Sequence, residues 1–514
     1  MKKIRQLFLS ISIGVLLSIG IVGCNHFEDL NTNPDTITTS NAAMQATMVI
    51  LENMRFVGDG RAFLTLNALS KYIGYVEESV MSYQYNGLGR TVFTPMTILP
   101  DIARMLEYAE GTTMEYSYRG LAKFSRAFMF YHLTMRVGDI PFSEAGQGLQ
   151  GNRTPRFEPQ RDVLIGILDE LRQADAYFAR GVRFTGDPTP FDGDPDRWRR
   201  ASNAFALRVL MSMSKHEADP TLRIRERFAE IVNGGYLMEA NTGFLGLQYT
   251  SLNRHPFSGT NPIFWQRTIL SSLLVEELQR LNDRRLFYFA EPAIQKLYDG
   301  YYASDFEAFV GADVSRSFAV LTTEFREGAF SILNRRYLDD YASDPRMMVT
   351  FAEQQLILAE ARIRGWITTG TAENFYKEGV RAALRDQMQA NPAFVHGMPI
   401  TQEFIDNYFT GAAAFASTTQ EQLEQIWMQR WIRNFMQDAL TTFFEFRRTG
   451  FPEFPINPAT NLNTNAPNAI PMRWMYPTSE VNFNHDNLIE ALVRQFGSES
   501  DEINNLMWVL RPPN

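Results

Sequence analysis

Residues 118–136 have the sequence YRGLAKFSRAFMFYHLTMR. The apolar side chains recur at steps of three and four residues, which places them on one face of an α-helix. These side chains are Leu121, Phe124, Phe128, Tyr131 and Met135. The segment Gly138-Asp139-Ile140-Pro141 follows and predicts the end of the helix. The stretch therefore predicts a long helix with one apolar face.

The same helical pattern recurs in several other segments of the chain. It extends over residues 198–213, 347–366 and 422–440, and the last of these is apolar nearly all round and is expected to be buried. Ala359 and Ala361 allow a neighbouring helix to approach closely, and Gly365 separates them from a further helical segment at 371–384. We therefore predict an all-α, mainly helical fold of degenerate tetratricopeptide-like helical hairpins, although no strict repeat is present.

Two regions depart from the helical pattern. Residues from about 241 to 346 are rich in aromatic residues, Gly, Asn, Ser and Asp, and predict a large, irregular, loop-rich insertion with short helices. Residues 452–471 contain five Pro and five Asn, which predicts a long loop. Long irregular segments are often functional, so we expect the insertion to form the ligand face.

The N-terminal residues predict export and a lipid anchor. Lys2, Lys3 and Arg5 precede the apolar run 7–22, and Cys24, the one cysteine of the chain, follows directly after Gly23. Small residues before a lone cysteine are similar to a bacterial lipobox, in which the signal peptide is cut ahead of an acylated cysteine. We predict a signal peptide at 1–23, lipid attachment at Cys24, a tether at 24–40 and a single domain at 41–514. An ordinary secretory signal with an incidental cysteine is the alternative.

Composition and motifs exclude several function classes. The 49 Lys and Arg against 58 Asp and Glu give a formal charge of −9, without a basic run, which argues against nucleic-acid binding. The sequence has no H-E-x-x-H, Gly-Lys or Gly-x-Ser-x-Gly motif, so zinc protease, P-loop and nucleophile-elbow chemistry lack a signature. We predict no catalytic residue and no enzyme activity.

One acidic loop could hold a metal ion. Its carboxylates are Asp187, Asp192, Asp194 and Asp196. They could bind Ca²⁺ through oxygen ligands, but Arg197 stands where an EF-hand requires Gly. A turn that caps the helix from Trp198 is the simpler interpretation. We predict no cofactor and leave a structural Ca²⁺ open as the alternative.

The aromatic residues offer the best candidate binding site. Flat rings beside amide and charged groups suit the C–H faces and hydroxyl edges of glycans, and such rings must stay partly exposed. The first cluster is Tyr83, Tyr85 and Asn86. The second comprises Trp265, Tyr301 and Tyr302, with Tyr298 in the same region, although Trp265 fits a core position equally well. Trp366, Trp427, Trp431 and Phe435 lie in helical segments and are interpreted as packing residues.

The chain carries a series of short motifs besides the lipobox-like segment at Cys24. They are LNTNP (30–34), GDIPF (138–142), WRRASN (198–203), LAEA (358–361), FRRTGFP (446–452) and RWMYPTSE (473–480). Together these motifs resemble the SusD-like (SusD/RagB) family of outer-membrane nutrient-binding lipoproteins, in its tetratricopeptide-rich second branch. Their order along the chain makes the set more specific than any single motif.

The resemblance implies a helical protein that lies over a SusC-like TonB-dependent transporter at the cell surface. Such a protein holds an oligosaccharide for import without cleaving it. Some members of the family serve peptides, so a peptide ligand is an alternative, and a surface glycosidase is the enzyme alternative. The resemblance also implies that Arg447, Arg448 and Glu480 form internal ion pairs and that Pro477 fixes a turn.

Overall fold

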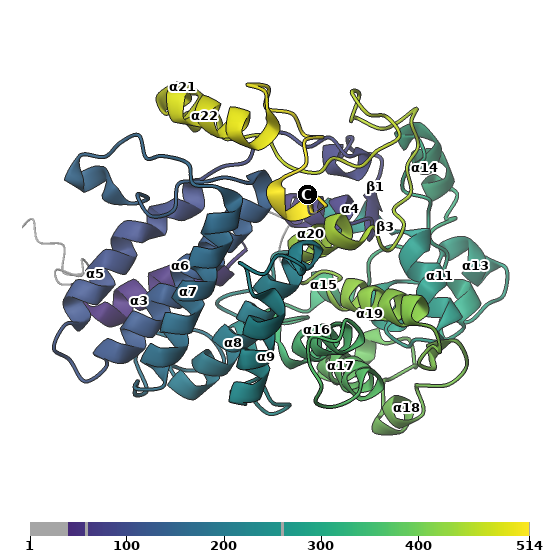
Figure 1. Ribbon diagram of the computed structural model, residues 1–514. Coiled ribbons are helices and arrows are strands. Elements are labelled where there is room, and N and C mark those ends of the chain that lie inside the picture. The colour runs from purple at the N-terminus through teal and green to yellow at the C-terminus, as the bar shows by residue number, and fades with distance from the viewer. Residues whose placement is uncertain (1–39, 57–59, 259–261, 513–514) are drawn as a thin grey trace, which may run out of the picture. The chain divides into compact units, whose positions relative to one another are not determined.

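The computed structural model describes residues 40–56, 60–258 and 262–512 (Figure 1). Cys24, the signal peptide and the tether up to residue 39 lie outside the described residues. Residues Ala42–Asn514 form one compact unit. No helix in the described ranges is both long and apolar enough to cross a bilayer.

Long helices packed side by side form the first half of this unit. Helix α6 (Glu115–Val137) packs against α7 (Gln160–Phe178), and α7 packs against α8 (Pro195–Ser212), as Figure 1 shows. Gly120 allows the close contact of α6 with α7, because a Cβ there would lie 2.8 Å from the Phe178 ring. Helices α3 (Ala42–Met54) and α5 (Leu99–Ala109) cover α6, and α9 (Ile224–Gly234) packs on α8.

A second group of helices follows the irregular region. Helices α16 (Phe351–Ile363) and α17 (Ala372–Gln387) form a hairpin, and α19 (Thr419–Arg433) packs on α16. Gly379 of α17 lies against Leu356, where a Cβ would meet its Cγ at 2.9 Å. The helices predicted at 118–136, 198–213 and 371–384 and the mainly helical fold class are confirmed.

Two predicted helices differ from the structure. Residues 346–350 form strand β4 (Arg346–Thr350), which pairs with β2 (Phe244–Leu247), and α16 begins only after the Thr350 hydroxyl accepts from the Glu353 amide at 3.2 Å. The expected helix 422–440 is interrupted between α19 and α20 (Ala439–Thr449). Met436 has φ +57° there, and its amide donates to Asn67 Oδ1 at 3.0 Å. Contacts with distant segments therefore override the local apolar pattern.

The irregular region contains short elements, as expected. Strand β3 (Thr268–Leu270) pairs antiparallel with β1 (Ile73–Tyr75). The helices are α10 (Pro262–Gln266), α11 (Ser272–Arg280), α12 (Leu286–Phe289), α13 (Ile294–Tyr298), α14 (Phe318–Arg326) and α15 (Arg336–Asp339). Elsewhere lie α4 (Gly60–Leu69), α18 (Gln402–Asp406), α21 (Thr478–Phe483) and α22 (His485–Phe496). Residues 452–471 form a loop, as predicted.

The acidic loop before α8 uses its carboxylates within the chain. Asp194 caps α8 by accepting from the Asp196 amide at 3.0 Å, and Asp187 accepts from the Trp198 indole at 2.7 Å. Asp192 pairs with Arg183 at 2.7 Å, and Asp196 pairs with Arg200 at the same distance. The capping interpretation is confirmed. Among the described residues, no group of three His, Cys, Asp or Glu could hold a metal ion.

Charged residues of α16 and α20 meet in the interior. Arg448 of α20 forms two hydrogen bonds with Glu360 of α16, at 2.7 and 2.8 Å, so the internal ion pair expected for Arg448 is confirmed. Arg447 differs, because it donates to the backbone oxygens of Met472 and Met135 and pairs with no carboxylate in the described part of the chain. Glu480 also lacks an ion pair there, and its carboxylate accepts from Asn484 at 3.2 Å.

Candidate functional site

The first predicted aromatic cluster lies mostly in the interior. Tyr85 is 4% exposed and Asn86 3%. The Tyr85 hydroxyl donates to Arg316 O at 3.0 Å, while Asn86 Oδ1 accepts from Lys71 Nζ at 2.8 Å. The half-buried Tyr83 accepts from the Trp474 indole at 2.8 Å. The expectation of partly exposed side chains is therefore wrong for Tyr85 and Asn86, which hold the turn in place.

The contacts of Lys71 explain why Tyr85 and Asn86 are buried. Its ammonium group is buried with acceptors at Gln84 O, 2.6 Å away, and at Asn86 Oδ1. Burial lowers the pKa of Lys71 to about 7. A buried amine needs such partners, and the turn 82–86 folds over it to supply them. The sequence offered no signal for this contact, because Lys71 lies outside the aromatic cluster.

The second predicted cluster divides into two places. Trp265, on α10, is half-buried, and its indole donates to Asn334 O at 3.2 Å. Tyr301 and Tyr302 follow α13 and are 39% and 75% exposed. Within the described ranges, no ring contact or hydrogen bond joins Trp265 to either tyrosine.

Three exposed tyrosines lie at and just after the end of α13, which Figure 1 labels. We call Tyr298, Tyr301 and Tyr302 the tyrosine platform. Tyr298 is 83% exposed. It is not among the site residues that the sequence predicts. Lys296 Nζ lies 4.9 Å from the centre of the Tyr301 ring, and Asp305 accepts from the Tyr302 amide at 2.8 Å. The platform thus combines exposed rings with charged groups at its edge.

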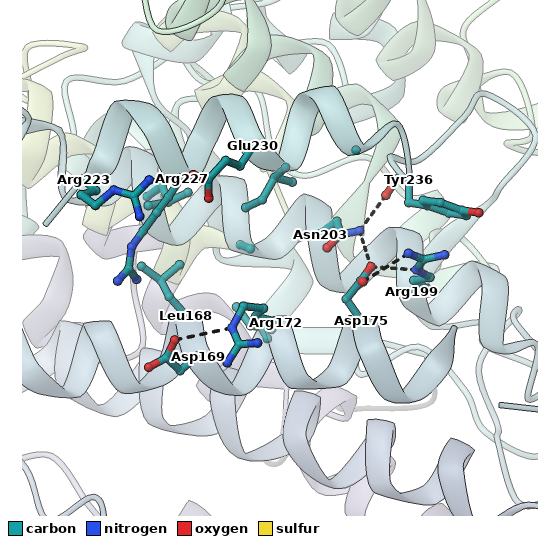
Figure 2. A pocket seen from close by; sticks show the side chains of 15 residues that line it. Leu168, Asp169, Arg172, Asp175, Arg199, Asn203, Arg223, Arg227, Glu230 and Tyr236 are labelled. Atoms are coloured by element: carbon teal, nitrogen blue, oxygen red, sulfur yellow. Dashed lines mark hydrogen bonds and ion pairs between the residues drawn. The ribbon is translucent and has the colours of Figure 1, made fainter. Parts of the chain in front are cut away.

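A groove of about 470 Å³ lies between α7, α8 and α9, and Figure 2 shows the side chains that line it. We call it the α7–α9 groove. Buried apolar side chains line its floor, namely Leu168, Leu171, Ala206 and Leu210. At one end Asp175 accepts from Arg199 and Asn203, each at 2.8 Å, and the Arg199 guanidinium lies 3.3 Å from the centre of the Tyr236 ring. The groove therefore combines an apolar floor with charged and polar sides.

A second cavity, of about 490 Å³, lies among α3, α4, α6, β4 and the connection from α19 to α20. We call it the polar cavity. Its lining includes the rings of Phe56, Phe63 and Phe128, and it also includes Arg136, Arg346, His132 and Asp438. The sequence does not predict any of these residues as part of a binding site, because the cavity brings together segments that are far apart along the chain.

A family model described as "Starch-binding associating with outer membrane" matches residues 34–477. The chain belongs to the SusD-like family. A solved SusD homologue from Bacteroides fragilis is 37% identical with a TM-score of 0.88, over 92% of this chain and 100% of that one. A second homologue from the same species is 29% identical with a TM-score of 0.81, at the same coverage.

More distant SusD-like proteins share the fold. A chitin-binding SusD homologue from Flavobacterium johnsoniae is 18% identical, with a TM-score of 0.69 over 92% of this chain and 99% of that one. No curated protein matches this sequence. The family is one of nutrient-binding proteins associated with the outer membrane.

Proposed function

We propose that this SusD-like protein binds oligosaccharides at the cell surface and passes them to a SusC-like TonB-dependent transporter without cleaving them. In this proposal acylated Cys24 anchors it in the outer membrane, and binding needs no cofactor. The family's starch-binding description and the chitin-binding homologue support a glycan ligand. The observation that carries the proposal is the tyrosine platform.

The platform has the chemistry that a glycan requires. Tyr298 and Tyr302 are 83% and 75% exposed, whereas tyrosines such as Tyr72, Tyr118 and Tyr376 are buried in the core. A sugar ring can place its C–H face on such a ring, while its hydroxyls bond to Lys296 or to nearby carboxylates. The Lys296 ammonium group lies 4.9 Å from the centre of the Tyr301 ring, and this attraction holds Tyr301 in position at the edge of the platform.

Removing the rings is expected to weaken glycan binding. We expect the double variant Tyr298→Ala/Tyr302→Ala to lose about tenfold or more in affinity, because a bound sugar covers these exposed rings and removing a large apolar side chain from water contributes about 1.5–3 kcal/mol. Isothermal titration with chitin and starch oligosaccharides measures the change. Tyr108→Ala is the control, since Tyr108 is 43% exposed but lies on α5. Parental affinity in the double variant would exclude the platform as the site.

The anchor is tested separately from the binding site. Changing Cys24→Ser is expected to move the protein from the outer-membrane fraction to the soluble fraction and to abolish labelling with palmitate, because the thiol carries the lipid. Detergent extracts of the parent are expected to contain a TonB-dependent transporter bound to it. Membrane attachment of the serine variant would contradict lipidation at Cys24.

The α7–α9 groove favours a second candidate, which is peptide capture. Its apolar floor could hold the apolar face of a peptide, and Arg172 and Glu230 offer charges of both signs at its rim. This candidate predicts that a peptide mixture raises the melting temperature while no oligosaccharide does. Shortening of an added oligosaccharide would instead indicate a glycosidase and would contradict the proposal of binding without cleavage.

A further inference from the structure

The polar cavity contains two arginines without a carboxylate partner. Arg136, at the end of α6, donates weakly to Thr91 Oγ1 at 3.4 Å, and its Nε has no hydrogen-bond partner. Arg346, on β4, donates to the Met348 sulfur at 3.2 Å. Neither guanidinium forms an ion pair within the described residues. In contrast, Arg55 of the same cavity pairs with Glu52 at 3.0 Å.

A guanidinium group that lines a cavity and forms no ion pair can bind an anionic ligand. Burial lowers the pKa of Arg136, and the opposing effect of Tyr83 does not offset it. Two planar guanidinium groups match the paired oxygens of a carboxylate, with which each can form two parallel hydrogen bonds. The whole chain carries a formal charge of −9, so two unpaired arginines at one cavity stand out against its net charge.

The cavity also has polar atoms that a carboxylate alone would leave without partners. His132 Nδ1 lies 2.8 Å from Phe128 O and is therefore the protonated nitrogen, so Nε2 remains an acceptor without a partner. Burial lowers the pKa of His132 to about 4, which keeps the ring neutral. Asp438 Oδ2 is a second acceptor, and Gln437 Nε2 a donor, without a hydrogen bond.

Sugar hydroxyls can satisfy such mixed groups. Each hydroxyl donates one hydrogen bond and accepts others, so it can donate to His132 or Asp438 and accept from Gln437. Asp438 lies 3.8 Å from Arg208, and the charge of Arg346 also acts on it, so the carboxylate needs a hydroxyl rather than a further cation. The rings of Phe56 and Phe63 provide apolar walls for the C–H faces. The volume of about 490 Å³ lies within the range of small-molecule sites.

We propose that the polar cavity binds a sugar unit bearing a carboxylate, such as a uronate unit of an acidic oligosaccharide. Arg136 and Arg346 hold the carboxylate, and His132, Gln437 and Asp438 bond to the hydroxyls. This inference rests on the proposed glycan-binding function and names a class of ligand for it. The site is separate from the tyrosine platform, which carries no arginine.

Trigalacturonate and maltotriose are suitable probes, because they have the same length and differ in charge. Isothermal titration is expected to show at least tenfold tighter binding of trigalacturonate, since hydrogen bonds between guanidinium groups and a carboxylate are stronger than those to a neutral hydroxyl. We expect Arg346→Gln to remove most of this preference for trigalacturonate, because it removes one of the two guanidinium groups that hold the carboxylate. Added NaCl is expected to weaken the binding of trigalacturonate alone.

The matched control is Arg55→Gln, which lies at the same cavity but removes an arginine already paired with Glu52. Circular dichroism checks that each variant is folded, and Arg346→Lys is a second variant that keeps the charge and is expected to restore part of the preference.

Equal affinity for the two probes, or parental affinity in Arg346→Gln, would overturn the inference while the platform result stands. Tighter binding of trialanine than of trigalacturonate would identify a peptide carboxylate as the ligand. Binding of neither saccharide would overturn the proposed function as well.

Discussion

Replacing Glu360 with alanine is expected to lower the free energy of unfolding by about 3–5 kcal/mol, because the variant leaves buried arginines without their carboxylate. Glu360 is fully buried on α16. Its two oxygens accept from Arg448 at 2.7 and 2.8 Å, and Arg364 lies 2.9 Å from the same carboxylate. The Trp427 indole donates to it at 3.0 Å. The carboxylate therefore links α16, α19 and α20.

Urea unfolding followed by far-ultraviolet circular dichroism measures this loss. The control is Glu490→Ala on α22, whose side chain is 70% exposed and lies 3.5 Å from Arg494. An exposed pair of this kind contributes about 0–1 kcal/mol. Equal, small losses for the two variants would show that the internal charges are solvated and that the network does not hold the helices together.

The same network has an expected pH dependence. Burial alone would raise the pKa of Glu360, but Arg448, with Arg364 and Arg430, lowers it to about 2. A carboxylate with a lowered pKa contributes its full stability above its unfolded pKa of about 4.3. That contribution is lost as the pH falls from there toward a value of about 2. The parent should therefore lose stability over this range more steeply than Glu360→Ala.

The helices that the sequence predicts well are those whose pattern is local. Leu121, Phe124 and Phe128 share a face of α6 because the helix repeat alone places them there. Strand β4 could not be predicted in this way, because Met347 and its neighbours become a strand only by pairing with β2. The break before α20 depends on Asn67, which lies 369 residues from Met436 along the chain.

The candidate sites likewise divide into positions that a local pattern predicts and positions that depend on contacts between distant segments. Tyr301 and Tyr302 follow Gly300, a turn residue, and this local signal indicated their exposure. Tyr85 and Asn86 lie in an equally polar turn, but the burial of Lys71 beneath it decides their position. The two arginines of the polar cavity that lack an ion pair come from α6 and β4, so only the folded structure brings Arg136 and Arg346 to one cavity.

Replacing Trp198 with alanine is expected to cost about 3–5 kcal/mol of folding free energy. The side chain is fully buried on α8. Its ring contacts four phenylalanines, with the centres of the Phe124 and Phe191 rings at 5.3 and 5.9 Å. The indole also donates to Asp187 Oδ2 at 2.7 Å. The substitution thus opens a cavity at the contact of α6, α7 and α8 and removes a hydrogen bond.

The variant Trp198→Phe separates these two contributions. It keeps a ring among the phenylalanines but removes the indole donor, and Asp187 Oδ2 still accepts from the Gly193 amide at 2.8 Å. We therefore expect a smaller loss of about 1–3 kcal/mol, measured by the same urea unfolding. Leu149→Ala, at a residue 93% exposed, is the control for loss of an apolar side chain at the surface. Equal losses in Trp198→Phe and Trp198→Ala would mean that the hydrogen bond to the acidic loop, rather than ring packing, fixes α8.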